Sequence, residues 1–211
     1  MDEGNEELSG DSCCVLDAVI CVHFVGANLH GLLIDVLAAV QLVVLVPEEV
    51  VGEVAGKGRK YRGLEQRWKR LVASRHVRVL PRVELATGFA RVIEVIEDIR
   101  ETDLEQAVRQ HRDLGEVVVV AHAVHLAEQG VDVKVLIDDH GGQRLAARWG
   151  LEVLAIEDIL TMAVELGFFP NAADLVGAYA KLRAFGDGML PFEKSGLKET
   201  HALWKSRRPT G

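Results

Sequence analysis

Five carboxylates stand where the predicted elements of this chain could bring them together: Asp17, Glu53, Glu116, Asp138 and Asp139. Asp17 closes a first strand, and the two later aspartates close another. Because ligands in open parallel sheets bind beyond the carboxyl ends of the strands, we expect these acids to converge. Clustered carboxylates raise each other's pKa values, and a hard divalent cation such as Mg²⁺ relieves that repulsion. The pattern therefore predicts a metal site made of four or five of these catalytic candidates, at which metal-bound water could attack a phosphodiester. For each acid taken singly, a solvated helix or strand end is the alternative.

A second chemical feature is the basic stretch over residues 57–82, which holds ten Lys or Arg against the single acid Glu65. Tyr61 and Trp68 lie among these cations. Cations contact phosphates and aromatic faces stack on bases, so the stretch favours binding of a single nucleic-acid strand. A solvated basic helix face, or one that meets an acidic partner, is the alternative. The candidate RNA-binding residues are Lys57, Arg59, Lys60, Arg62, Arg67, Lys69 and Arg70. For Lys205, Arg207 and Arg208 near the C-terminus, a disordered solubilising tail is favoured over phosphate contacts.

The overall composition sets limits on the class of protein. The chain has 211 residues, of which 49% are hydrophobic and 27% charged, with a net charge of −8. This composition predicts one globular domain, and the net charge taken alone argues against nucleic acid. Three unpaired cysteines, with no Cys-x-x-Cys, predict buried thiols rather than a disulfide framework or a zinc ribbon. The acidic N-terminus does not resemble a signal peptide, and the apolar stretches are too short to span a bilayer, so we expect a cytoplasmic protein without a membrane segment.

Short apolar strands alternate with helices along the chain, which predicts an α/β fold. We expect strands at 14–16, 42–46, 77–80, 133–137 and 151–154, in a three-layer α/β/α domain with a central parallel sheet of four or five strands. The run over 115–130 begins with four valines but keeps helical spacing up to Gly130, so we predict a helix there. The domain boundaries expected are an acidic flexible tail at 1–12, the main domain at 13–170, and a C-terminal helix with an extended basic tail at 171–211.

Two other patterns do not predict a site. The segment 52–57 (GEVAGK) has too few residues between its glycines for a phosphate-binding P-loop. His122 and His125 have a spacing that can hold a transition metal, but no third His or Cys accompanies them, so surface or core-edge histidines are the better interpretation.

The acidic segments resemble those of PIN domains. The residues that carry the resemblance are VLDAVI around Asp17, VPEEVVGEV around Glu53, DLGEVVVVAHAVHLA around Glu116, and VLIDDHGGQRLAARWGLEVLAIEDIL around the Asp138-Asp139 pair. The last segment is followed by a predicted helix and GFFP. The chain is similar to the PIN subgroup with a Gly-Glu pair at the third acidic position, and the resemblance covers roughly 13–170.

This resemblance implies a nuclease domain that uses Mg²⁺ or Mn²⁺ to cleave single-stranded RNA. The five acids take the metal-binding roles, with the choice between Asp138 and Asp139 left open. Many bacterial members are VapC-type toxins, which implies a small antitoxin protein as a partner and a homodimer.

The sequence departs from the family pattern in three places. Val19 stands where a small polar residue usually forms a hydrogen bond in the active site. The segment between Glu53 and Glu116 is long, and the chain continues from Pro170 to residue 211. A catalytically silent RNA-binding or partner-binding module on the same fold is therefore the first alternative. A small-molecule α/β enzyme is the second.

Overall fold

The computed structural model describes residues 12–84, 89–110, 112–185 and 189–207. The predicted acidic tail thus lies, except for Ser12, outside the described residues, as does Arg208.

Five parallel strands form one sheet, which confirms the predicted fold class. They are β1 (Ser12–Leu16), β2 (Leu42–Pro47), β3 (Val77–Leu80), β4 (Val133–Leu136) and β5 (Glu152–Leu154), in the order β3-β2-β1-β4-β5. Apolar, β-branched runs suit strands that helices cover on both faces. The central strand β1 pairs with β2 on one side and with β4 on the other. All carboxyl ends therefore open on one edge of the sheet.

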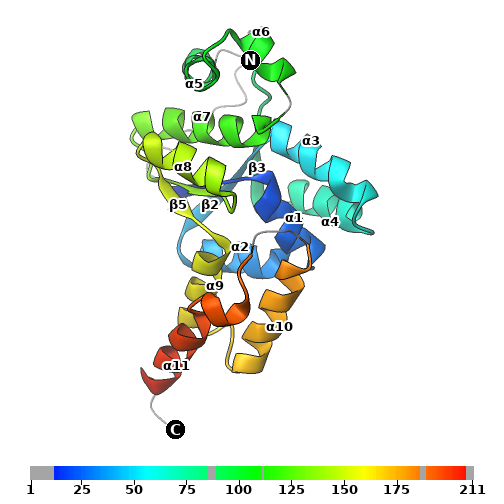
Figure 1. Ribbon diagram of the computed structural model, residues 1–211, viewed down its shortest axis with the longest axis vertical. Coiled ribbons are helices and arrows are strands. Elements are labelled where there is room, and N and C mark those ends of the chain that lie inside the picture. Colours follow the sequence, from blue (N-terminus) through cyan, green and yellow to red (C-terminus); the bar gives the residue numbers. More distant parts are fainter. Residues whose placement is uncertain (1–11, 85–88, 111, 186–188, 208–211) are drawn as a thin grey trace.

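Helices cover both faces of the sheet, giving three layers (Figure 1). On one face lie α7 (Leu114–Glu128) and α8 (His140–Arg148), and on the other lie α2 (His30–Ala39) and α9 (Ile156–Glu165). The predicted helix over 115–130 is α7, which is buried almost all round because it lies between the sheet and another helix. The remaining helices before α7 are α1 (Ala18–Gly26), α3 (Glu48–Gly56), the 3₁₀ turn η1 (Lys57–Arg59), α4 (Leu64–Val72), α5 (Ala90–Arg100) and α6 (Leu104–Arg109).

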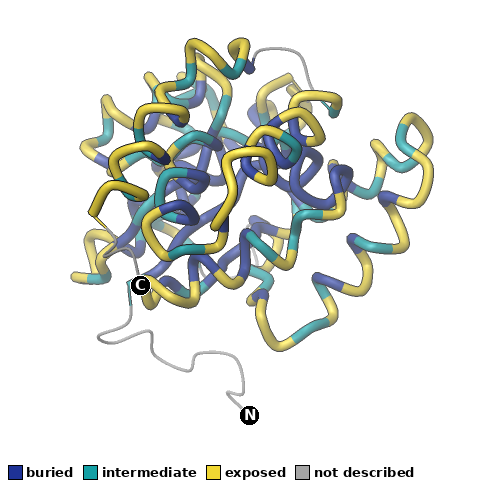
Figure 2. The backbone as a smooth tube through the Cα atoms, turned by 90° about the horizontal axis from the view of Figure 1, so that it is seen from below, coloured by how far each residue is buried: buried dark blue, intermediate teal, exposed yellow. Residues whose placement is uncertain are grey.

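The core is continuous from the sheet into the surrounding helices, with exposed residues on the outer helix surfaces (Figure 2). Cys13, Cys14 and Cys21 are buried and free, as predicted. Within the described residues no single helix is long and apolar enough to cross a membrane, and one bent pair, α1 with α2, passes that test only by length and composition.

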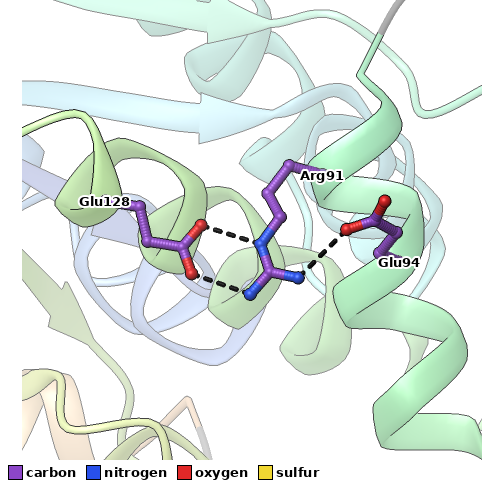
Figure 3. Close-up of polar contacts among 3 residues, drawn as sticks. All are labelled: Arg91, Glu94 and Glu128. Atoms are coloured by element: carbon purple, nitrogen blue, oxygen red, sulfur yellow. Dashed lines mark hydrogen bonds and ion pairs between the residues drawn. The ribbon is translucent and has the colours of Figure 1, made fainter.

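The long segment between Glu53 and Glu116 includes a helical hairpin, α5 with α6, that lies over α7. Arg91 on α5 forms two hydrogen bonds of 2.7 Å with Glu128 on α7 and a third of 3.1 Å with Glu94 (Figure 3). Exposed ion pairs of this kind contribute about 0–1 kcal/mol to stability, so the contact of α5 with α7 is stabilised mainly by the buried valines of α5. At the other end of α5, Arg100 donates to the carbonyl oxygen of Arg112 at 2.6 Å. This end of the hairpin therefore lies beside the start of α7.

The C-terminal region contains a helix where an extended tail was predicted. After α10 (Ala172–Arg183) and the 3₁₀ turn η2 (Phe192–Lys194), α11 (Leu197–Arg207) packs against α9. Leu197 is buried, and the His201 ring nitrogen Nε2 lies 3.0 Å from the Phe169 carbonyl oxygen. The prediction was wrong because it followed the Gly, Pro, Lys and Arg content and overlooked the helical spacing of Leu197, His201 and Trp204. Lys205 and Arg207 lie on this helix.

Asn171 directly precedes α10. It stands at the N-cap position of α10, but its side chain accepts no hydrogen bond from the helix. Its Nδ2 instead donates to Asp174 Oδ2 at 3.2 Å.

Candidate functional site

The sheet changes its winding direction at β1, and the candidate acids lie at that point. The chain leaves β1 toward β2 and β3, then crosses back to β4 on the other side. Such a switch point opens a crevice at the carboxyl edge of an open α/β sheet. Asp17 follows β1, the pair Asp138-Asp139 lies just beyond β4, and Glu53 lies on the helix that follows β2.

Asp17 is held rigidly at this edge. It is only 2% exposed and caps α1, where its Oδ2 accepts a hydrogen bond from the Val19 amide at 3.1 Å. Its pKa is raised to about 6, mainly by burial and to a smaller extent by the charges of Glu53 and Asp139, against the opposing effect of the backbone hydrogen bonds. A buried carboxylate facing other acids is an unfavourable arrangement that a cation would relieve.

Gly115 makes room for Glu53 beside Asp17. A Cβ at Gly115 would lie 2.8 Å from Glu53 Oε2 and 3.9 Å from Asp17 Oδ1. Glu53 Oε2 and Asp17 Oδ1 are therefore separated by no more than the sum of these two distances. The other oxygen of Glu53, Oε1, lies 3.8 Å from Lys57 Nζ, one turn later. The glycine that precedes Glu116 thus acts through the space it leaves.

Gly141 and Gly142 have the same effect for Glu116 and Asp139. A Cβ at Gly142 would lie 3.1 Å from Glu116 Oε2, and one at Gly141 would lie 4.0 Å from that oxygen and 2.7 Å from Asp139 Oδ2. Asp139 caps α8, since its Oδ2 accepts hydrogen bonds from the amides of Gly141 and Gly142. The start of α7 and the start of α8 thus bring their acids together.

Burial and the neighbouring acids together raise the pKa of Glu116. Burial raises its pKa to about 7, and the charges of Asp17, Asp139, Asp113 and Glu53 add to the rise in that order. Asp113 was missed in the sequence. It lies three residues before Glu116 with a left-handed φ of 55°, which Asp tolerates better than most residues. An acid one helical turn before a candidate ligand is the signal that could have found it.

Asp138 faces a different part of the molecule. Its Oδ1 lies 3.5 Å from the Ile156 amide at the start of α9. Burial and Glu157 raise the pKa of the Tyr179 hydroxyl, and the charge of Asp138 adds a smaller contribution. It is not among the charges that shift Asp17 or Glu116. Of the two adjacent aspartates, Asp139 is therefore the one that joins the other acids. We call Asp17, Glu53, Glu116 and Asp139 the acid centre.

The acid centre suits a hard divalent cation by its chemistry, since all of its donors are carboxylate oxygens. Among the described residues, no three His, Cys, Asp or Glu side chains are arranged closely enough to hold a metal ion as they lie. The space left at Gly115, Gly141 and Gly142 is nevertheless already filled by carboxylate oxygens rather than by apolar groups alone.

The basic stretch contains both exposed and structural cations. Arg67 donates from Nε to the Val25 carbonyl oxygen at 2.9 Å and from Nη2 to that of Gly26 at 3.2 Å, at the end of α1. Lys69 pairs with Glu65 at 2.7 Å. The exposed residues of the predicted RNA-binding set are Lys57, Arg59, Lys60, Arg62, Lys69 and Arg70.

The two aromatic side chains of this stretch pack against the protein, whereas the sequence predicted that they would stack on bases. Trp68 is 1% exposed and donates from Nε1 to the Val51 carbonyl oxygen at 3.1 Å, so the prediction that it stacks on bases is wrong. Tyr61 is partly exposed, but its ring packs on Phe185 and its hydroxyl donates to the Phe185 carbonyl oxygen at 3.0 Å. Lys60 Nζ lies 5.1 Å from the centre of the Tyr61 ring.

The two histidines of α7 fit the core-edge interpretation. His122 is 2% exposed, and burial, followed by the charge of His125, lowers its pKa to about 4. Phe89 packs edge-on against both rings, at 5.7 Å and 6.4 Å between ring centres.

Comparison of the chain with protein-family models, with curated proteins and with solved structures gave no match.

Proposed function

We propose that this protein is a metal-dependent endoribonuclease of the PIN type that cleaves single-stranded RNA. The observation that carries the proposal is the convergence of four acids, from four separate elements, at the switch point of a parallel sheet. Structural ion-pair networks also shift pKa values, but here the neighbours that raise them are other carboxylates. Carboxylates gathered in this way repel one another and destabilise the fold unless a cation or a proton is bound among them.

The acid centre would hold Mg²⁺ or Mn²⁺, with Asp139 in place of Asp138 among the predicted ligands. When bound, such an ion activates water and neutralises charge on the phosphate. Asp17 is a rigid member because its carboxylate caps a helix. Glu53 and Glu116 have longer side chains whose rotation could close the group. Because the pKa of Glu116 is raised, cation binding is expected to release a proton from it.

The exposed cations of η1, of the turn after it and of α4 would guide the RNA strand to this centre. Lys57 connects the two features, since its ammonium lies beside Glu53. Phosphate contacts of this kind do not depend on sequence, so they supply affinity rather than specificity. The family resemblance extends the proposal to a toxin restrained by a small antitoxin protein, and to a homodimer.

A second candidate is a catalytically silent RNA-binding or partner-binding module on the same fold. Val19 favours it, because an apolar side chain stands beside Asp17 where the related family usually has a polar one. The spacing of the acids, which is too wide to hold a metal ion in the described residues as they lie, also favours it.

The adjacent aspartates provide a matched test of the proposal. We would measure Mn²⁺ binding by electron paramagnetic resonance and cleavage of a labelled unstructured RNA, with wild type, Asp139→Asn and Asp138→Asn. The first variant is expected to lose both properties and the second to keep both, since only Asp139 lies in the acid centre. Cleavage that persists in Asp139→Asn would contradict the proposed site. A wild type that binds RNA but neither Mn²⁺ nor Mg²⁺ would favour the silent module.

A further inference from the structure

The segment that follows β3 reaches the same edge of the sheet as the acid centre. Since β3 is parallel to β2 and β1, Arg82 and Val83 emerge at the carboxyl edge, just beyond Leu80. Neighbouring strands lie about 4.8 Å apart, so β3 is about 10 Å from the strand that carries Asp17. Arg75 precedes β3 and therefore lies toward the opposite edge.

A hydrogen bond fastens this segment to the helix that carries Glu53. Glu49 Oε1 accepts a hydrogen bond of 2.8 Å from the Val83 amide. Glu49 lies on α3, one helical turn before Glu53. Val83 is 5% exposed and belongs to the core, so both its side chain and its backbone are held. The segment thus has a fixed position relative to the acid centre.

Arg82 lies between Pro81 and this fixed valine, and its side chain is exposed. Among the described residues, no hydrogen bond or ion pair engages its guanidinium. Arg67, in contrast, is bound to two carbonyl oxygens, and Lys69 is paired with Glu65. Arg82 is therefore a cation at the catalytic edge that is available to an anion, on a backbone that does not move freely.

We propose that Arg82 binds a phosphate of the substrate strand next to the one that is cleaved, and that Glu49 is the positioning residue that holds it there. The proposal rests on the proposed nuclease function. Arginine suits this role because its planar guanidinium can give a phosphate two hydrogen bonds. The substrate strand would then run across the ends of β1, β2 and β3, on the side of the cations of η1 and α4.

The test combines a binding measurement with a cleavage measurement on the full chain. Binding of a fluorescein-labelled oligouridine strand is followed by anisotropy over a range of salt concentrations, with Ca²⁺ in place of Mg²⁺. Cleavage of the same strand is followed with Mg²⁺ and with Mn²⁺. The variants are Arg82→Gln, Arg82→Lys, Glu49→Ala and Glu49→Gln. The control is Arg148→Gln, at the last turn of α8, where the helix has run toward the opposite edge.

Arg82→Gln is expected to weaken binding about tenfold, and loss of one phosphate contact should lower the slope of log K against log salt by about 0.7. Arg82→Lys should recover part of the affinity, and Arg148→Gln should behave as wild type. Glu49→Ala should reproduce both the loss of affinity and the lower salt slope, because Arg82 would no longer be held at the phosphate, whereas Glu49→Gln, which keeps an oxygen acceptor, should not. If Glu49→Ala fails to fold, the Arg82 variants decide the question alone.

The outcomes separate this inference from the proposed function. Equal affinities and salt slopes for Arg82→Gln and Arg148→Gln would overturn the role of Arg82, whether or not the wild type cleaves RNA. A wild type that cleaves nothing while Arg82→Gln still loses affinity would contradict the nuclease and keep Arg82 as a phosphate-binding residue. A wild type that binds no strand would overturn both.

Discussion

The raised pKa of Asp17 makes a definite prediction about stability. The pKa of its carboxyl rises from the ordinary 3.8 to about 6 in the folded protein, mainly because the group is buried. The folded state therefore holds the proton more tightly than the unfolded state does. As pH rises from about 4 through about 6, this group lowers the stability of the fold, and the cost is then constant at higher pH. Since one pKa unit is worth about 1.4 kcal/mol, the full cost is about 3 kcal/mol.

Asp17→Asn removes this cost while keeping the helix cap. The amide oxygen can still accept the hydrogen bond from Val19, and the amide nitrogen would face Glu53 and Asp139 with a donor in place of a charge. We expect the variant to be more stable than wild type by up to about 3 kcal/mol at pH 8 without metal. At pH 4 the difference from this group should nearly vanish.

The assay is urea denaturation of both proteins at pH 4, 6 and 8, first with EDTA and then with Mn²⁺. Free Mn²⁺ at a hundredfold excess over its Kd should stabilise the wild type by about 2.7 kcal/mol and the variant by much less. If Asp17→Asn is no more stable than wild type at pH 8, or if the difference is the same at all three pH values, the electrostatic reasoning is wrong.

Three further substitutions, two of them with a matched control, test the acid centre and the basic stretch. Gly142→Ala would place a Cβ 3.1 Å from a carboxylate oxygen and 2.8 Å from an isoleucine methyl, so cleavage should fall at least about tenfold if roughly 1.4 kcal/mol of positioning is lost; Gly177→Ala, with open space around it, should at most stabilise α10. Arg67→Met, which removes two hydrogen bonds from the end of α1, should cost about 1–3 kcal/mol in urea denaturation, whereas Arg70→Met at the exposed surface should cost less than about 0.5 kcal/mol. Val19→Thr keeps the side-chain shape and adds a hydroxyl two residues after Asp17, so kcat/KM for RNA should rise up to about tenfold if that hydroxyl reaches the acid centre; an unchanged rate would show that the valine does not weaken the site.

The strands and the acids at their ends could be predicted because local sequence determines both. An apolar run that stops at a carboxylate, as at Asp17, places that carboxylate at a strand end whatever the rest of the chain does. Glu116 could be placed in the same way, at the start of a helix after a glycine. The parallel arrangement then brings such ends to one edge of the sheet.

The directions of individual side chains could not be predicted with the same success. Asp138 and Asp139 are adjacent, and nothing local says which one faces the crevice. Only the packing of α9 against one side and of α7 against the other decides it. The burial of Trp68, in contrast, could have been predicted, because its spacing from Leu64 and Leu71 places it on the inner face of α4. The prediction instead followed the cations that surround it in the sequence.

The net charge of −8 is divided among parts of the chain with different consequences for a polyanion. Five acids lie in residues 1–11, whereas residues 57–82 carry ten cations and one acid. The α5–α6 hairpin presents exposed acids such as Glu101 and Glu105, and its end is tied to Arg112 beside the start of α7. Screening limits such fields to about 8–10 Å, so each acts only on its own side of the acid centre. In the proposed function, an RNA strand would therefore be repelled on the hairpin side and attracted on the side of η1, α4 and β3, and this local contrast, rather than the total charge, would determine where it can approach.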